Sequence, residues 1–162
     1  MIQTATSESI LQSWSQSLMA NYGQPAVALV RGQNATVWDA DGKRYIDLIA
    51  GIAVNSLGHA HPHLINAVTA QIETLGHTSN LAAHPQVVKL AQRLVAHTGL
   101  NAKVFFCNSG AEANEAAVKI SRLTGRSQIV SLADSFHGRT VGALSVTGQP
   151  EKSKPFQPLL SN

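Results

Sequence analysis

A short run of small polar residues, 108–111, follows an apolar segment and leads into a helical pattern. The run reads Asn-Ser-Gly-Ala and comes directly after the β-prone residues 103–107. A strand that ends in such a turn and continues as a helix presents free backbone N–H groups and the positive end of the helix dipole to an anion. Gly110 lets an anion approach the backbone, and the Ser109 hydroxyl offers one more hydrogen bond. The pattern indicates a phosphate site, although Ser109 acting as a simple helix cap explains it equally well.

The phosphate site would be of neither common nucleotide-binding type. Residues 108–111 and their neighbours contain neither the Gly-x-x-x-x-Gly-Lys of a P-loop nor the Gly-x-Gly-x-x-Gly of a dinucleotide-binding fold.

A second polar run, 134–140, follows the next β-prone segment, 128–133. Ligands of open α/β sheets bind beyond the carboxyl ends of the strands. Phe136 offers a flat face for stacking, His137 a titratable edge, and Arg139 a forked donor for a carboxylate. The alternative is a loop with one buried phenylalanine. Taken together, the two runs predict one shared ligand, an aromatic ring that bears a phosphate.

Three alternating histidines, His59, His61 and His63, form the remaining candidate cluster. Histidines are common metal ligands. Pro62 makes the segment a turn, however, and a loop that leads into a helix explains the histidines without a metal. We therefore expect no metal site.

The apolar periodicity predicts the elements that must position these residues. Helical spacing appears at residues 7–20, 62–75, 85–97 and 111–123, with a short helical stretch after Gly138. Ser7 is the expected N-cap of the first of these helices. Residues 26–31 and 35–39 are β-prone, and Asp41-Gly42 between 36–38 and 44–46 predicts a hairpin turn. Strands at 103–107 and 128–133 around a helix predict a parallel pair with a right-handed crossover. Two parallel strands with a single crossover cannot be covered on both faces, as a parallel sheet needs to be. This predicts that further elements follow.

The composition favours a globular protein. Apolar residues make up 44% of the 162 residues, and the formal charge is +3 without a cluster of lysine or arginine. This excludes a phosphate-backbone track, so we expect no nucleic-acid partner. No stretch approaches the roughly 20 apolar residues of a membrane span, and the N-terminus lacks the pattern of a signal peptide. One cysteine, Cys107, suits a reducing compartment and is interpreted as a buried thiol. We expect a cytoplasmic protein that does not bind membranes.

Seven stretches resemble the fold-type I, pyridoxal-phosphate-dependent aminotransferases of class III, and within them the acetylornithine aminotransferases of arginine biosynthesis. Three of them are Leu-Gly-His-Ala-His-Pro at 57–62, the stretch 105–117, which contains Asn-Ser-Gly-Ala-Glu-Ala-Asn-Glu, and Phe-His-Gly-Arg-Thr at 136–140. The others lie at 22–32, 37–48, 50–55 and 75–80. The resemblance covers nearly all of this chain but well under half of a full family member. It implies an α/β fold with an N-terminal arm and small β layer (1–57), followed by the start of the large parallel-type domain (58–162).

By this resemblance the cofactor is pyridoxal 5'-phosphate. Ser109, Gly110 and Ala111 would hold its phosphate, Phe136 would stack on its ring, and His137 would flank the ring. Arg139 would contact the substrate. The residues 55–61 and 79–80 would line the substrate entrance or a dimer interface. Glu115 is expected to be structural, whereas Glu112 reaching the active site stays open.

The resemblance also implies the reaction and its limits. The family transfers the terminal amino group between N-acetylornithine and 2-oxoglutarate or glutamate, usually as a homodimer. The family's Schiff-base lysine and its pyridinium-binding aspartate fall beyond Asn162, and none of the six lysines here lies in the matching context. We therefore expect no catalytic residue in this chain and no turnover by it alone. Two alternatives stay open: a fragment of a related ω-aminotransferase acting on ornithine, succinylornithine or 4-aminobutyrate, and a non-enzymatic truncated product.

Overall fold

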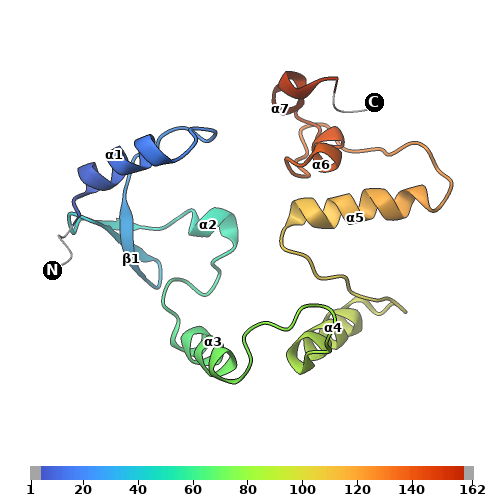
Figure 1. Cartoon of the computed structure of the whole chain (residues 1–162), viewed down its shortest axis with the longest axis horizontal. Coiled ribbons are helices and arrows are strands. Elements are labelled where there is room, and N and C mark those ends of the chain that lie inside the picture. Colours follow the sequence, from blue (N-terminus) through green and yellow to red (C-terminus); the bar gives the residue numbers. More distant parts are fainter. Residues whose placement is uncertain (1–4, 159–162) are drawn as a thin grey trace. The chain divides into compact units, whose positions relative to one another are not determined.

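The computed structural model describes residues 5–158 of the chain. Its contacts fall into two compact units, one that extends to Ala82 and one that begins at Ala83. Figure 1 shows the order of the elements along the chain. These two units do not test the predicted domain boundary between residues 57 and 58, which stays a prediction. Among the described residues, no helix has both the length and the apolar character needed to cross a membrane.

The first unit contains a helix joined to a small antiparallel sheet. Helix α1 (Ser7–Ser17) precedes the strands β1 (Leu29–Gln33), β2 (Thr36–Asp39) and β3 (Arg44–Ile46), which pair in the order β1-β2-β3. The sheet confirms the predicted hairpin at Asp41-Gly42, where Gly42 has a φ of 83° that favours glycine. The first predicted run, 26–31, was placed slightly too early, because β1 begins at Leu29.

A buried aspartate stabilises the hairpin turn. Asp39 accepts hydrogen bonds from the N–H groups of Asp41 and Lys43 at 3.0 and 2.9 Å, and from the Tyr45 hydroxyl at 2.7 Å. The Tyr45 hydrogen bond is the largest cause of a lowered pKa for Asp39. The turn therefore owes its shape to an ionised side chain as well as to the Asp-Gly pair.

The predicted N-cap of α1 was wrong by one residue. Thr6 caps the helix by accepting a hydrogen bond from the Ser9 N–H at 3.2 Å. Ser7 is instead the first helical residue, and its N–H donates to the Asp41 carboxylate at 3.0 Å. An N–H in the first helical turn has no acceptor inside the helix, so Asp41 satisfies it and ties α1 to the hairpin.

Two further helices complete the first unit. Helix α2 (Ala50–Ala53) is a left-handed turn, because φ is 48° at Ala50, 64° at Gly51, 66° at Ile52 and 61° at Ala53. No sequence pattern predicted it. Helix α3 (Pro62–Thr74) confirms the predicted helix, with proline in its first turn as expected.

The second unit is helical. It consists of α4 (Pro85–Thr98), α5 (Gly110–Arg122), α6 (Val141–Ser145), α7 (Pro150–Ser153) and the 3₁₀ turn η1 (Lys154–Phe156). Helix α4 confirms the predicted helix at 85–97, and Gly99, with a φ of 66°, ends it. The most buried side chains of this unit gather at α6, where Ala143 is 0% and Leu144 4% exposed. The short elements α7 and η1 were not predicted from the sequence.

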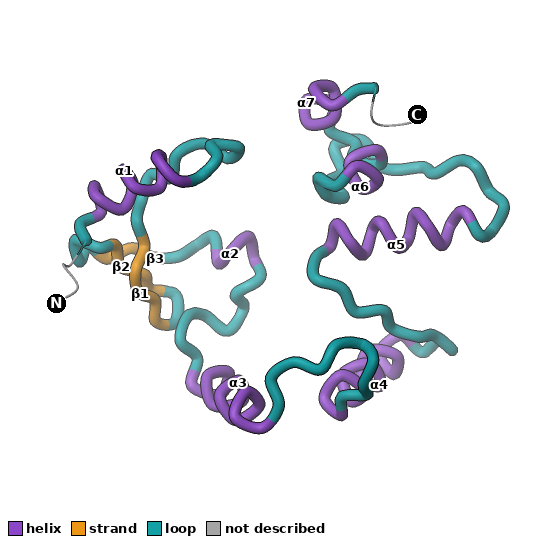
Figure 2. Tube along the Cα trace, in the orientation of Figure 1, coloured by secondary structure: helices purple, strands orange, loops and turns teal. Residues whose placement is uncertain are grey.

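The two predicted parallel strands are not formed in the described part of the chain. Residues 103–107 and 128–133 are loop segments on either side of α5 (Figure 2). A segment becomes a strand only when a neighbour supplies hydrogen-bonding partners, and every strand pairing among the described residues lies in the first unit. Val130 and Leu132 consequently stay 92% and 79% exposed. Cys107, predicted to be buried, is only half-buried.

Candidate ligand-binding site

The start of α5 forms the first half of the candidate site, and we call residues 108–111 the α5 turn. Ser109 is the N-cap, and its hydroxyl accepts a hydrogen bond from the Glu112 N–H at 3.1 Å. The Glu112 carboxylate in turn accepts from the Asn108 N–H at 2.6 Å. This reciprocal arrangement is a variant of the capping box, displaced by one residue. Ser109 therefore does cap the helix, as the alternative interpretation of the pattern held, and Glu112 supports the turn by accepting from Asn108.

The backbone of the α5 turn is also open to a ligand. The N–H groups of Gly110 and Ala111 lie in the first helical turn, where N–H groups have no acceptor within the helix. A Cβ placed on Gly110 would meet no atom within 4 Å. The turn thus combines unsatisfied donors, the positive end of a helix dipole and free space above the backbone, which is the arrangement that binds phosphate.

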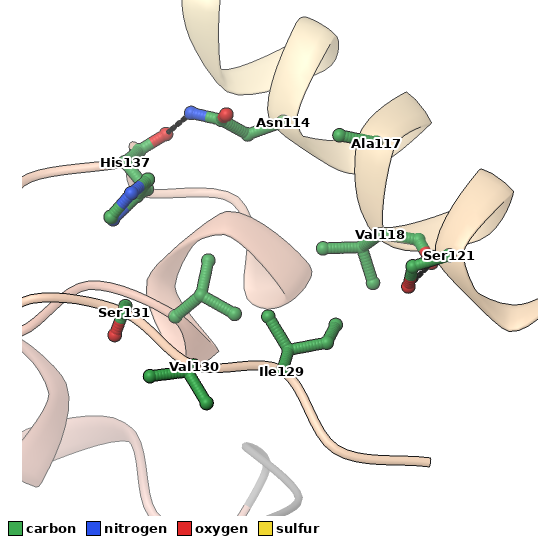
Figure 3. A pocket seen from close by; sticks show the side chains of 9 residues that line it. Asn114, Ala117, Val118, Ser121, Ile129, Val130, Ser131 and His137 are labelled. Carbon is green, nitrogen blue, oxygen red and sulfur yellow. Dashed lines mark hydrogen bonds between the residues drawn. The ribbon is translucent and has the colours of Figure 1, made fainter. Parts of the chain in front are cut away.

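The second half of the site is the 136–140 loop, and the structure brings it against α5. The Asn114 side-chain amide donates to the His137 carbonyl oxygen at 2.6 Å (Figure 3). Gly138 is buried with a φ of 134°, and a Cβ there would lie 2.7 Å from the Cβ of Ala111. The predicted proximity of the two polar runs is therefore a feature of the structure, although the strands expected to create it are absent from the described residues.

A carboxylate fixes the far end of the same loop. One oxygen of Glu115, Oε1, accepts hydrogen bonds from the Thr140 hydroxyl at 2.5 Å and from the N–H groups of Gly142 and Ala143 at 2.9 and 3.1 Å. The Thr140 hydrogen bond is the largest cause of a lowered pKa for Glu115. These contacts confirm the expected structural role of Glu115.

The three side chains of the loop with predicted roles lie in different surroundings. Phe136 is 54% exposed, which overturns the alternative of a loop with a buried phenylalanine. The N–H of His137 donates to the Thr147 hydroxyl at 3.1 Å, and its ring Nδ1 lies 3.4 Å from the Ser135 hydroxyl. Arg139 is exposed. An exposed ring and an exposed guanidinium are thus presented close to the α5 turn.

A cavity of about 150 Å³ lies beside α5. It separates α5 from the segment 129–131, and Figure 3 shows Asn114, Val118 and Ser121 of the helix on one side. His137 lines it, whereas the residues of the α5 turn do not. The candidate site is therefore the exposed surface of turn and loop rather than this cavity.

Sequence reasoning missed Asn114 and did not foresee which groups Glu115 would bind. Ala111, Asn114 and Glu115 are spaced i, i+3 and i+4, so they share one face of α5. That spacing is the signal in the sequence, and it indicates a common face without naming its partner.

One histidine of the candidate cluster, His59, makes a structural contact in the first unit. His59 Nε2 lies 2.8 Å from the Asp47 carboxylate, which also accepts from the N–H groups of Ile49 and Ala50 at 3.1 and 2.8 Å. The His59 hydrogen bond is the largest cause of a lowered pKa for Asp47. Across residues 5–158, no group of three or more possible metal ligands comes together.

Comparisons with known proteins show which family the chain belongs to. The model of the family "Aminotransferase class-III" matches residues 18–162. The chain is 56% identical to the acetylornithine aminotransferase of Streptomyces coelicolor over 95% of its own length, and 58% identical to that of Mycolicibacterium smegmatis over 94%. It covers 38% and 39% of those two proteins. The chain thus spans about two fifths of the curated relatives it matches.

Solved structures share the fold of this part. The taurine:2-oxoglutarate aminotransferase of Bifidobacterium kashiwanohense, solved with PLP and glutamate, matches 93% of this chain with a TM-score of 0.84 and 31% identity. The ornithine aminotransferase of Toxoplasma gondii matches 95% with a TM-score of 0.85 and 29% identity. The chain covers 35% and 38% of those structures. These likenesses confirm the predicted fold class, and the chain belongs to the class III aminotransferases.

Proposed function

We propose that this chain is part of a pyridoxal-phosphate-dependent transaminase of arginine biosynthesis. The enzyme would move the terminal amino group between N-acetylornithine and 2-oxoglutarate, with glutamate as the other product. The observation that carries the proposal is the identity of 56% and 58% to two acetylornithine aminotransferases over nearly the whole chain. Identity to the taurine and ornithine enzymes is far lower, at 31% and 29%, so the alternative substrates have less support.

The residues present fit the cofactor. A phosphate needs several N–H donors and free space, and the α5 turn supplies both at Ser109, Gly110 and Ala111. An aromatic ring needs a flat apolar surface, and Phe136 is 54% exposed, two residues before the glycine that packs on α5. When bound, pyridoxal phosphate supplies the electron sink for amino-group transfer. We assign Ser109, Gly110 and Ala111 to its phosphate, and Phe136 and His137 to its ring.

Arg139 is proposed to bind a substrate carboxylate. Its side chain is exposed on the 136–140 loop, one residue after the glycine that packs on α5. A guanidinium forms two parallel hydrogen bonds with a carboxylate, which fixes orientation as well as position. N-acetylornithine and 2-oxoglutarate both carry such a group.

The six lysines of this chain are proposed to have no catalytic role. They are Lys43, Lys89, Lys103, Lys119, Lys152 and Lys154. Lys43 lies 5.1 Å from the centre of the Tyr45 ring, and Lys152 pairs with Glu151 at 3.3 Å. Five of the six are exposed. Exposed ammonium groups of this kind act as surface charges.

Assembly and location are further parts of the proposal. A homodimer is supported by α1, whose Ile10, Leu11 and Trp14 follow helical spacing and offer an apolar face to a partner. A cytoplasmic location is supported by a single cysteine, which suits a reducing compartment.

A chimera tests the substrate. This chain would replace the matching part of the Streptomyces coelicolor acetylornithine aminotransferase, and kcat/KM would be measured with N-acetylornithine, ornithine and 4-aminobutyrate. We expect N-acetylornithine to be preferred, and Arg139→Ala to raise KM for the substrate with little effect on the spectrum of bound cofactor. A preference for ornithine or 4-aminobutyrate would assign the chain to a related transaminase instead.

A further inference from the structure

We infer that Glu115 is a positioning residue that fixes the 136–140 loop beside the α5 turn, and thereby sets the geometry between the ring-binding and phosphate-binding groups. The inference rests on the proposed function, because it concerns the same site. Glu115 itself touches neither ligand in this account. It acts through Thr140, Gly142 and Ala143, whose donors all converge on its Oε1 atom.

One face of α5 holds the loop at three points. Ala111 packs against Gly138, Asn114 binds the carbonyl oxygen of His137, and Glu115 binds the residues that follow Arg139. The loop is therefore held on both sides of Arg139 by residues of the same helix that carries the α5 turn. A rigid helix between the two halves of the site keeps them in a fixed relation.

Of these three residues, Glu115 makes the most hydrogen bonds to the loop and the start of α6, so its replacement removes the most contacts. Its carboxylate serves three donors, and two of them are backbone N–H groups at the start of α6. Ala143 is fully buried, so its N–H has no ready access to water if the carboxylate is removed. Unsatisfied buried donors are costly, and the loop would shift to recover partners. Asn114 supplies only one hydrogen bond, and Ala111 supplies only packing.

Hydrogen exchange of the 162-residue chain tests the contact itself. Glu115→Ala is compared with Glu73→Ala, which removes an exposed glutamate from α3 in the other unit. We expect exchange at the amides of Gly142 and Ala143 to rise on the order of tenfold in Glu115→Ala and to stay unchanged in Glu73→Ala. If the amides of Gly142 and Ala143 exchange at the same rate in Glu115→Ala as in the unaltered chain, the inference is overturned.

Binding of two ligands separates positioning from general stability. Affinities for pyridoxal phosphate and for inorganic phosphate are measured by calorimetry for the unaltered chain, Glu115→Ala and Glu115→Gln. Glu115 holds the loop rather than the α5 turn. Glu115→Ala should therefore lower the affinity for pyridoxal phosphate on the order of tenfold and change the affinity for inorganic phosphate by no more than about twofold. Glu115→Gln keeps a side-chain oxygen acceptor and should recover most of the lost affinity.

Each remaining outcome has a defined meaning. Equal losses for both ligands would show that Glu115 merely stabilises the unit, which contradicts a positioning role. If the unaltered chain binds neither ligand, the proposed function fails, and the exchange experiment still decides whether Glu115 holds the loop.

Discussion

Gly138 and Ala111 lie so close together that a Cβ on the glycine would sit 2.7 Å from the alanine Cβ. The contact joins the two halves of the candidate site, which are separated in sequence by most of α5 and by the loop segment after it. Gly138 also has a φ of 134°, where side chains are rarely tolerated. The position therefore requires glycine for two independent reasons.

Gly138→Ala is expected to separate the loop from the helix. The backbone strain and the clash together should cost about 1–3 kcal/mol in the free energy of unfolding, measured by denaturant titration. Gly125→Ala is the matched control, since Gly125 has a φ of 76° but no atom within 4 Å of an added Cβ. The control should lose less stability and keep its affinity for pyridoxal phosphate. Equal losses in the two variants would show that the clash with Ala111 is unimportant.

Ser109→Ala is expected to weaken both the helix and the phosphate site. Removing an N-cap hydroxyl costs about 0.5–2 kcal/mol in stability. Ser109→Asp separates the two effects, because aspartate caps helices well but its charge repels phosphate. Thermal unfolding should therefore be near normal in Ser109→Asp while phosphate binding is lost. Normal phosphate binding by Ser109→Asp would mean that the anion binds elsewhere.

Glu115 predicts a loss of stability in acid. Its pKa is lowered from the ordinary value of 4.5 in the folded chain, mainly by the Thr140 hydroxyl. A lowered folded pKa gives stability that is fully present above the unfolded pKa and is lost as pH falls through the folded pKa. Glu115→Gln should flatten this part of the stability profile below pH 4.5. The measurement is the free energy of unfolding as a function of pH for both chains, and parallel curves would argue against an ionised Glu115.

Asp47 and His59 form a hydrogen-bonded pair next to the start of α2. Asp47→Ala removes the acceptor for His59 and for the N–H groups of Ile49 and Ala50, where the left-handed α2 begins. We expect a lower melting temperature and faster hydrogen exchange at residues 49–50. Zinc should leave the melting temperature of the unaltered chain unchanged. A rise on adding zinc that disappears in His59→Ala would support a metal site.

Local signals predicted much of the fold. Asp41-Gly42 specified a hairpin because Gly42 accepts the positive φ of the turn, and Pro62 and Gly99 marked helix ends through their own φ preferences. The left-handed turn at 50–53 gave no such signal, since its alanines and isoleucine ordinarily avoid positive φ. Residues 103–107 and 128–133 have the composition of strands but lack partners among the described residues, and pairing is not a local property.

The sequence predicted the residues of the candidate site but not the contacts that hold them in place. Ser109 and Gly110 follow a pattern with a direct physical meaning for anions. The contacts of Asn114 with His137 and of Glu115 with Thr140 span 23 and 25 residues, and side-chain contacts at that separation depend on the tertiary fold.

The central claim is that the α5 turn and the 136–140 loop bind pyridoxal phosphate without a lysine of this chain. The most direct test is a visible-absorption titration of the purified chain with pyridoxal phosphate, followed by borohydride reduction and peptide mapping, with Ser109→Asp in parallel. We predict saturable binding that Ser109→Asp abolishes, and no specific adduct on any of the six lysines. A stoichiometric adduct on one lysine, or equal binding by Ser109→Asp, would contradict the account.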